Sequence, residues 1–302
     1  MSSNKTWEAM LRIKEATRNH SRWPERILIG ADATPSFCTE RCCNDSLAVI
    51  DVNAKASSCF ENDFIDVHLP KTSQLSRDDA RMLELYLPYA LVGVEARTHR
   101  RSIAISHFAQ TLDGRIASDS GDSKWIGNED NLTHAHRMRA LCDAILIGSK
   151  TLEVDNPRLN VRLVEGSSPI RVIIGGDELC VEEYQAVDKD TILFCQNHSA
   201  SSHVNKVTLL RDERYATKEI LQELFRRGLH SVYIEGGCYT TSSFLTQGML
   251  DQIQLHISPM ILGSGRSSFE FPGAEDMSGA LRFKTGRFVD VGADVMFVGS
   301  LA

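Results

Sequence analysis

From residue 102 to the end of the chain, short aliphatic runs alternate with stretches of helical periodicity. The runs SIAISHFAQ, DAILIGS, IRVIIGG, TILFCQ and SVYIEGG are rich in Ile, Val and Leu and predict buried strands. Strands that alternate with helices form a mostly parallel sheet with helices on both faces. The segment RFVDVGADVMFVGSL predicts two antiparallel strands that close the sheet at one edge. The pattern therefore predicts an α/β fold.

Polar residues mark where the helices of this region begin and end. Asn128 stands before Glu129 and Asp130 and predicts a helix start, because an Asn side chain accepts a hydrogen bond from the first free N–H groups. Thr217 predicts a second start, and Gly228 predicts the end of that helix.

The first hundred residues follow a less regular pattern. An amphipathic helix is predicted at 6–20, strands are predicted at 26–32, 47–53 and 63–69, and Ser76 predicts the start of a helix that Pro88 is expected to end. The basic, polar segment THRRS at 98–102 predicts a boundary. We therefore expect a small mixed α/β extension at residues 1–98 and the main α/β domain at residues 99–302.

Composition argues against several classes of protein. The formal net charge of −7 does not favour binding to nucleic acid. No apolar run approaches the length of a membrane span, and the N-terminus lacks the apolar centre of a secretory signal, so a cytoplasmic location is expected.

The eight cysteines predict reduced thiols rather than a metal site. They include no CxxC pair, and the segment CTERCC, which contains Cys38, Cys42 and Cys43, lacks the second spaced pair and the His partners that zinc needs. No metal is expected, and reduced thiols suit the cytoplasm.

Three segments at predicted strand ends carry residues that suit a ligand. The glycines of EGGCYTTSS (235–243) precede a predicted helix start, and LGSGRSSF (262–269) combines glycines with Arg266; both suit a phosphate, or are ordinary tight turns. The segment VDNPRLNVR (154–162) places Asp155 and Arg162 at the mouth of the sheet. An acid beside an anion-binding guanidinium indicates proton donation to a phosphorylated substrate, although a lone exposed Asp is usually only solvated.

Other single residues have both a structural and a functional explanation. Trp125 precedes the helix that is predicted to start at Asn128, and its ring is either a partly buried anchor or a wall against a flat ring of a ligand. Arg137 and Arg139 lie late in the same helix. Their positive charges either complement the helix dipole or bind an anion. Asp113, before a glycine, predicts a structural turn.

Six segments form one ordered set: AQTLDGRIA, GDSKWI, HRMRALCDAILIGSKT, VDNPRLNVR, VYIEGG and ISPMILGSG. In this order they resemble the reductase domain of riboflavin biosynthesis, the C-terminal domain of the bacterial bifunctional deaminase–reductase. The resemblance covers two-thirds of the chain, from residue 100 or so onward. It implies a dihydrofolate-reductase-like fold and an NADPH-dependent enzyme. Its substrate would be a ribosylaminopyrimidine 5′-phosphate, whose ribosyl ring is reduced to a ribityl chain.

The resemblance also implies roles for individual residues. Expected substrate contacts are Ser123, Arg139, Leu159, Arg162 and Glu235, with Arg162 on the phosphate. Expected cofactor contacts are Ala109, Trp125, Thr151, Asp155, Gly176, Gly237, Cys238, Tyr239, Thr240, Thr241, Ser242 and Ser243. The sugar carbon C1′ accepts hydride as an imine, so the ring oxygen must leave with a proton. Asp155 is the expected catalytic proton donor, and Glu235 is the alternative.

The sequence departs from the family pattern in two places. Residues 1–100 contain neither the His-x-Glu nor the Pro-Cys…Cys signature of the zinc deaminase, so no deaminase activity is expected. Gly176 stands where the family has a serine that contacts the cofactor, and the carboxylate of Asp177 would repel a 2′-phosphate. NADPH is the expected cofactor, with NADH possible.

Two other functions remain open at this point. The same fold and cofactor suit a reductase of a pterin or another heterocycle, because one fold hosts many functions. A binding paralogue that holds a nucleotide without turnover is the second alternative. The family resemblance further implies a homodimer formed through the closing strands.

Overall fold

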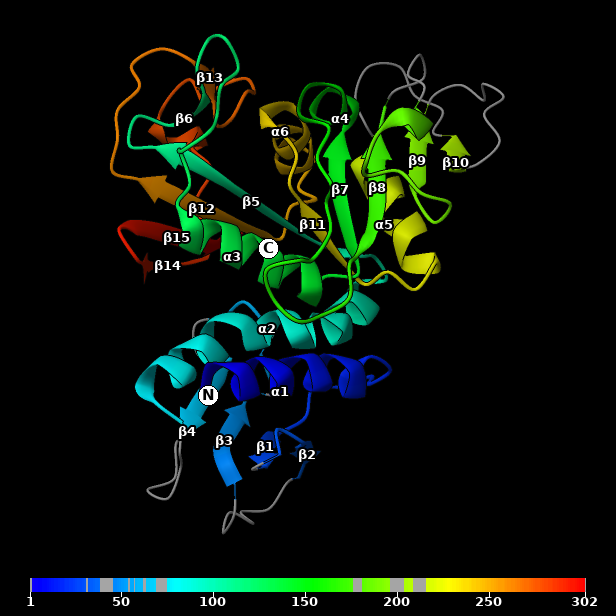
Figure 1. The fold of residues 1–302 in the computed structure, drawn as a ribbon, viewed down its shortest axis with the longest axis vertical. Helices are drawn as coiled ribbons and strands as arrows, with labels where there is room; N and C mark the ends of the chain where they lie inside the picture. The colour runs from blue at the N-terminus through cyan, green and yellow to red at the C-terminus, as the bar shows by residue number, and fades with distance from the viewer. Residues whose placement is uncertain are drawn as a thin grey trace. The chain divides into compact units, whose positions relative to one another are not determined.

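The computed structural model describes residues 2–30, 32–38, 46–53, 55–56, 58–61, 64–68, 75–175, 181–195, 204–208 and 216–301. The chain divides into two compact units, Met1–Arg100 and Arg101–Ala302 (Figure 1).

The first unit contains two helices and an antiparallel sheet. The helices are α1 (Ser2–Thr17) and α2 (Arg77–His99), and the sheet has the order β2-β1-β3-β4, formed by β1 (Arg26–Gly30), β2 (Pro35–Phe37), β3 (Ser46–Val52) and β4 (Ile65–His68). The rings of Trp7 and Tyr86 meet edge to face, with centroids 6.0 Å apart, and join the two helices. This arrangement confirms the predicted N-terminal α/β extension.

The prediction that Pro88 ends the second helix is wrong. As expected, Ser76 starts α2, in a capping box with Asp79, but the helix continues past Pro88 to His99. A proline inside a helix costs about 3 kcal/mol. The flanking Leu87 and Tyr89 are both buried, and full burial of each such side chain stabilises the fold by about 2 kcal/mol, which offsets that cost.

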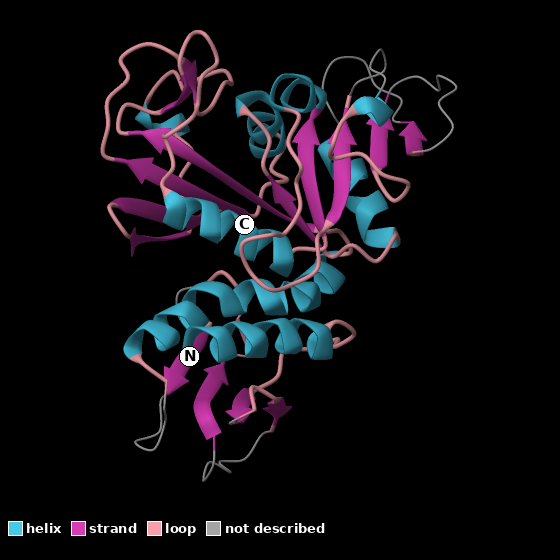
Figure 2. Ribbon diagram, viewed as in Figure 1, coloured by secondary structure: helices cyan, strands magenta, loops and turns pink. Residues whose placement is uncertain are grey.

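In the second unit, the described strands form a nine-stranded sheet in the order β10-β9-β8-β7-β11-β5-β12-β15-β14. Figure 2 shows the strands in magenta and the helices in cyan. The strands are β5 (Ile103–Thr111), β7 (Ala144–Gly148), β8 (Ile170–Ile174), β9 (Ile192–Cys195), β10 (Asn205–Thr208), β11 (Ser231–Ile234), β12 (Gln252–Ser258), β14 (Thr285–Val291) and β15 (Asp294–Ser300). All neighbours from β10 to β12 are parallel, whereas β15 is antiparallel to both β12 and β14. The predicted α/β class, the mostly parallel sheet and the antiparallel closing strands are confirmed.

A separate two-stranded ribbon pairs β6 (Arg115–Ala117) with β13 (Arg266–Ser267). The helices of this unit are α3 (Glu129–Leu141), α4 (Ser149–Asp155), α5 (Thr217–Arg226) and α6 (Cys238–Thr246), and the two short 3-10 turns are η1 (Val181–Glu183) and η2 (Met277–Gly279).

Helices cover both faces of the large sheet. On one face, Leu224 of α5 and Phe244 of α6 belong to a buried apolar cluster with strand residues such as Leu146. On the other face, Met138 of α3 contacts the side chain of Gln254 on β12. The residues on either side of Gln254, Ile253 and Leu255, pack in the cluster on the first face. The alternation of side chains along each strand therefore produces two buried layers.

The two predicted helix starts have different outcomes. Asn128 caps α3 as expected, and its side-chain oxygen accepts a hydrogen bond of 2.8 Å from Asn131 N. The expected cap at Thr217 is wrong, because Ala216 occupies the cap position and Thr217 is already helical. The Thr217 hydroxyl instead donates to Gln247 Oε1 at 2.9 Å, which ties the start of α5 to the end of α6.

None of the helices in the described ranges combines the length and the apolar character needed to cross a bilayer. The cysteines of the described part are free thiols: Cys38, Cys59, Cys142, Cys195 and Cys238. Cys42, Cys43 and Cys180 lie outside the described residues. Among the described residues, no group of three or more His, Cys, Asp or Glu side chains is placed to hold a metal ion.

Three histidines are buried together on the α3 face of the sheet. The ring centroid of His107 lies 5.0 Å from that of His134 and 6.3 Å from that of His256. Burial lowers the pKa of His134 to about 4 and holds the pKa of His107 well below its ordinary value. Burial also lowers the pKa of His256, and this effect outweighs Asp294, whose Oδ2 lies 3.1 Å from His256 Nε2. The cluster is therefore neutral at pH 7.

We predict that acid destabilises the second unit through this cluster. A histidine in the unfolded chain takes up a proton near pH 6.5, whereas folded His134 does so only near pH 4. The unfolded state therefore binds more protons in this window, and the free energy of unfolding falls as the pH decreases from about 6.5 to about 4. His134→Gln keeps a polar group opposite Gln254 and should remove about 2 kcal/mol of the loss between pH 7 and pH 5.

Urea titrations of both proteins at the two pH values measure this difference. His99→Gln changes an exposed histidine of the first unit and should leave the acid loss in the second unit unchanged. If His134→Gln loses as much stability on acidification as the wild type, the explanation is wrong.

Candidate functional site

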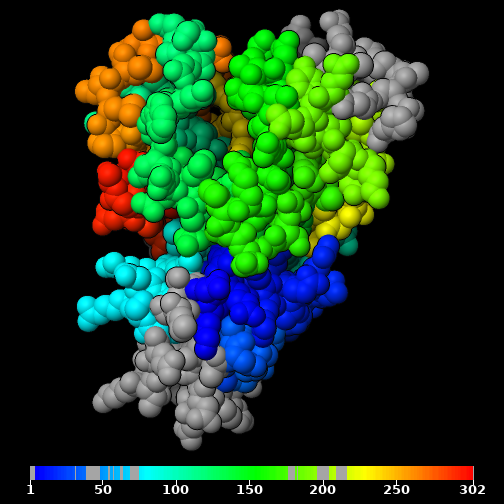
Figure 3. All heavy atoms as spheres, viewed as in Figure 1, coloured from blue at the N-terminus to red at the C-terminus, as the bar shows by residue number. Residues whose placement is uncertain are grey.

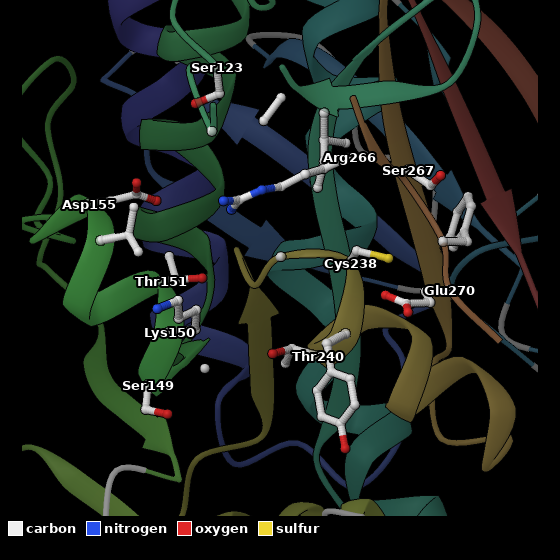
Figure 4. A pocket seen from close by; sticks show the side chains of 18 residues that line it. Ser123, Ser149, Lys150, Thr151, Asp155, Cys238, Thr240, Arg266, Ser267 and Glu270 are labelled. Carbon is white, nitrogen blue, oxygen red and sulfur yellow. The ribbon is translucent and has the colours of Figure 1, made fainter. Parts of the chain in front are cut away.

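A cavity of about 750 Å³ opens at the carboxyl ends of β7 and β11, which are neighbouring parallel strands near the centre of the sheet. The space-filling view shows the surface hollowed at this place, between the segment around β6 and α4 (Figure 3). The lining residues are Ile116, Ala117, Gly121, Ser123, Gly148, Ser149, Lys150, Thr151, Val154, Asp155, Gly237, Cys238, Tyr239, Thr240, Arg266, Ser267, Phe269 and Glu270 (Figure 4). Open α/β sheets bind ligands at this edge.

Glycines let the first turn of α6 lie against the end of β7. A Cβ atom on Gly148 would lie 2.8 Å from Thr240 Oγ1, and a Cβ atom on Gly236 would lie 2.7 Å from Thr240 Cβ. Gly237 is the N-cap of α6 and supplies no side chain to bond the first N–H groups. The start of α6 therefore presents backbone donors and partial positive charge to the cavity.

The remaining residues of the predicted cofactor turn hold α6 in place. The Thr241 hydroxyl is hydrogen-bonded to Ser106 at 3.0 Å, and Ser242 Oγ accepts a hydrogen bond of 2.8 Å from Glu270 N. Ser243 Oγ donates to the carbonyl of Tyr239 at 2.8 Å. All three side chains are buried, so only the first part of the turn, Gly237 to Thr240, lines the cavity.

The segment 154–162, expected at the mouth of the sheet, begins within α4, which ends at Asp155. Thr151 and Asp155 are four residues apart in that helix, so both side chains lie on the face that lines the cavity. Within the described part of the chain, the Asp155 carboxyl makes no hydrogen bond or salt bridge. Asp155 is open to the cavity, but the cavity wall partly desolvates it and raises its pKa, while Arg266 acts in the opposite direction.

Arg139 and Glu235 form a bidentate ion pair that is largely buried. Arg139 Nε donates to Glu235 Oε1 at 2.7 Å, and Nη2 donates to Oε2 at 2.6 Å. Arg139 Nη1 also donates to the carbonyl of Asn160 at 3.1 Å. Burial alone would lower the pKa of Arg139, but the Glu235 carboxylate raises it above its ordinary value. The pair joins α3 to the end of β11 and to the segment that follows α4.

Two further predicted substrate contacts lie in that segment. The backbone N–H of Arg162 donates to His136 Nδ1 at 3.1 Å, and Arg162 Nη1 donates to Asn160 Oδ1 at 3.1 Å. Burial, together with the charges of Arg139 and Arg162, lowers the pKa of His136 to about 4, so its ring is a neutral acceptor at pH 7. Leu159 is buried with a φ of 53°, a conformation that costs a non-glycine residue energy.

Two other predicted cofactor contacts, Trp125 and Ala109, do not line the cavity. Trp125 is 85% exposed and has a φ of 73°, so it is not a buried anchor. Ala109 is half-buried on β5 and lies close to Gly127. A Cβ atom on Gly127 would come within 3.3 Å of the Ala109 Cβ. Gly176 and the neighbouring Asp177 lie outside the described residues.

Lys150, Arg266 and Glu270 line the cavity although the sequence did not assign them to the site. Arg266 carried a signal, since it stands in a glycine-rich turn that suits a phosphate. The predicted turn residue Asp113 explains how that turn is held. Its carboxylate accepts hydrogen bonds from the Thr111 hydroxyl and from the backbone N–H groups of Leu262 and Gly263, and these bonds lower its pKa to about 2.

Comparison with known proteins gives a consistent result. Residues 103–297 match the RibD C-terminal domain family. The chain is 29% identical over 209 residues to the 2,5-diamino-6-ribosylamino-4(3H)-pyrimidinone 5′-phosphate reductase of Methanothermobacter thermautotrophicus, across 65% of this chain and 96% of that protein. It is 35% identical over 186 residues to the riboflavin biosynthesis protein RibD of Corynebacterium ammoniagenes, across 60% of this chain and 50% of that protein. The chain thus spans about half the length of this bacterial relative.

Two solved structures share the fold. The diaminohydroxyphosphoribosylaminopyrimidine deaminase/5-amino-6-(5-phosphoribosylamino)uracil reductase of Thermotoga maritima aligns with a TM-score of 0.65 and 21% identity, over 98% of this chain and 99% of that one. The riboflavin biosynthesis reductase Rib7 of Saccharomyces cerevisiae aligns with a TM-score of 0.54 and 21% identity, over 67% of this chain and 91% of that one. Since the family match covers more than half of the sequence and nearly all of the second unit, the chain belongs to the RibD C-terminal domain family.

Proposed function

We propose that the chain is an NADPH-dependent reductase of riboflavin biosynthesis. It converts a ribosylaminopyrimidine 5′-phosphate, either 5-amino-6-ribosylaminouracil 5′-phosphate or its diamino precursor, to the ribitylamino product. One observation carries the proposal: a single cavity at the carboxyl ends of β7 and β11 brings together Ser123, Asp155 and the start of α6. The reductases among the relatives support the same reaction class.

The cavity fits a dinucleotide. The start of α6 offers backbone N–H groups, Thr151 and Thr240 offer hydroxyls, and Lys150 and Arg266 offer positive charge, which together suit phosphate groups. The nicotinamide, when bound, supplies the hydride. The exposed ring of Trp125 and the small side chain of Ala109 suit contact with the flat parts of such a cofactor.

The segment after α4 suits the phosphorylated substrate. Arg162 is exposed, and its backbone N–H is held by His136, which supports its guanidinium as the proposed ligand of the 5′-phosphate. Arg139 and Glu235 present fixed donors and acceptors to the substrate, and Leu159 and Ser123 complete the proposed contacts. Because Arg139 and Glu235 hold each other in place, they orient the substrate without having to be ordered when it binds.

Reduction breaks the bond between C1′ and the ring oxygen, forms a C–H bond at C1′ and leaves one proton on the oxygen. Asp155 is the proposed donor of that proton. Both oxygens of Glu235 already accept hydrogen bonds from Arg139, whereas the Asp155 carboxyl has no such partner among the described residues. Desolvation by the cavity wall favours the protonated form of Asp155, as a general acid requires.

We further propose that this activity resides in residues 99–302, that residues 1–98 have no deaminase activity, and that the protein is a homodimer. The closing strands support the last point, because β14 is the last strand of the sheet and Phe288 on it is 69% exposed. An edge strand with an exposed aromatic side chain is suited to pairing with a second chain.

Asp155→Asn should lower kcat by about 100-fold or more, because the carboxamide cannot donate the proton with comparable ease. The assay follows NADPH oxidation with 5-amino-6-ribosylaminouracil 5′-phosphate and checks the product for a mass gain of two hydrogens. Asp190→Asn, which changes an exposed carboxylate outside the cavity, should retain full turnover. Full turnover by a folded Asp155→Asn protein would remove Asp155 from the chemistry, and a wild type that binds NADPH without turnover would point to another heterocyclic substrate.

Arg162→Ala should raise KM for the phosphorylated substrate by about 10- to 100-fold and lower kcat much less, because a charge-assisted phosphate contact contributes binding energy. The substrate without its phosphate should not distinguish the variant from the wild type. Arg158→Ala is the matched control in the same segment, since its guanidinium is held by Gln185 Oε1 at 3.1 Å. Equal KM values for Arg162→Ala and the wild type would rule out Arg162 as the phosphate ligand.

A further inference from the structure

We propose that Arg266 couples cofactor binding to the protonation of Asp155. It faces Asp155 across the cavity in this structure, and it turns to a phosphate group of the dinucleotide when the cofactor binds. Loss of the guanidinium from the neighbourhood of Asp155 then leaves that carboxyl protonated for the reaction. The inference rests on the proposed function and adds a residue to it: Arg266 is a cofactor ligand and a positioning residue for the proton donor.

The backbone at Arg266 is firmly anchored. Arg266 stands opposite Ala117 in the ribbon of β13 and β6. The residues before it are held at two points, because Asp113 accepts the backbone N–H of Gly263 at 2.7 Å and Ser264 Oγ donates to Asp119 at 2.7 Å. The side chain therefore starts from a fixed position at the wall of the cavity opposite α4 (Figure 4).

The guanidinium itself has no fixed partner. Within the described residues it makes no hydrogen bond and no salt bridge, in contrast to Arg139 and Arg115, which are bonded to Glu235 and Ser267. It lies against the backbone of Gly121, where a Cβ atom would come within 3.0 Å of Arg266 Nη2. Gly121 has a φ of 90°, a backbone conformation that favours glycine. An unpaired guanidinium in a cavity is available to an incoming anion.

Two opposing influences act on Asp155. Partial desolvation raises its pKa, and the charge of Arg266 lowers it. A phosphate that draws Arg266 away and adds its own negative charge removes the lowering influence and raises the pKa further. The reaction consumes one hydride and one proton, so a donor that takes up a solvent proton as the cofactor binds is loaded before the substrate reacts.

The other charged and titratable groups of the cavity do not replace Arg266 in this role. Lys150 on α4 is paired with Glu153 at 3.0 Å. On the opposite wall, burial raises the pKa of the Cys238 thiol, and the negative charge of Glu270 raises it further. Glu270 therefore cannot supply the positive charge that Arg266 brings to the cavity. Tyr239 also lines the cavity and is not a cation. Among the described residues, Arg266 is thus the cation whose charge lowers the pKa of Asp155.

The test is calorimetric titration of the whole protein with NADPH in two buffers of different ionisation enthalpy, from about pH 5 to about pH 7, which gives both Kd and the number of protons taken up. The 2′-phosphate of NADPH also titrates near pH 6, so the difference between wild type and Asp155→Asn isolates the contribution of Asp155. We expect the wild type to take up a larger fraction of a proton than Asp155→Asn. Arg266→Gln should take up as few protons on NADPH binding as Asp155→Asn does, and its Kd for NADPH should rise about tenfold or more.

Arg282→Gln is the matched control, because it removes the same charge from the second unit outside the cavity and should change neither quantity. Arg266→Lys keeps the charge and should restore part of the uptake. An Arg266→Gln protein with wild-type affinity, or with weakened affinity and wild-type uptake, overturns the inference. A variant that loses affinity for the phosphorylated substrate alone, and not for NADPH, assigns Arg266 to the substrate and also overturns it. A wild type that does not bind NADPH refutes the proposed function itself, and that result is distinct from the other failures.

Discussion

The bidentate pair of Arg139 and Glu235 is the interaction on which the geometry of the site depends. It connects α3, the end of the central strand β11 and, through the carbonyl of Asn160, the segment after α4. Two charges with little exposure cost several kcal/mol to desolvate, and only good geometry with additional hydrogen bonds offsets this cost. Both conditions are met here, so the pair fixes three distant segments in one place. Loss of either member would leave the other charge buried without its partner and would release the segment that carries Leu159 and Arg162.

The direction of the strands explains why the cavity forms where it does. Since β7 and β11 are neighbours and parallel, their carboxyl ends meet at one edge, and α4 and α6 both start there. Gly148 and Gly236 keep these two helix starts close, because a side chain on either would collide with Thr240. The ribbon of β6 and β13 supplies the opposite wall. A site assembled from four separate parts of the chain is thus fixed by backbone pairing before any polar contact is made.

The sequence predicted the fold well because strand and helix periodicities are local signals. The helix starts at Asn128 and Ser76 were likewise predicted from neighbouring residues, and the structure confirms both. The errors arose where tertiary packing outweighed the local signal. Burial of the residues around Pro88 lets α2 continue past the proline, and the Thr217 hydroxyl donates to Gln247 instead of capping α5. The same limit applies to the site. No local pattern pairs Arg139 with Glu235, and Arg266 reaches the cavity only through the register of β13 on β6.

The candidate site divides into groups that are held and groups that are not. Arg139, Glu235 and the backbone of Arg162 have fixed partners, and Leu159 and Trp125 have left-handed backbone conformations that the surrounding structure must enforce. Such groups suit the recognition of a substrate, because their positions do not change when it binds. Asp155 and Arg266 have no hydrogen-bonded partner among the described residues, so their interaction is electrostatic and easily altered by a ligand. Proton transfer requires a group whose charge changes during the reaction, and a rigid ion pair would resist that change. The physical demands of binding and of proton donation therefore fall on different side chains, and this division follows from which side chains the fold has already paired.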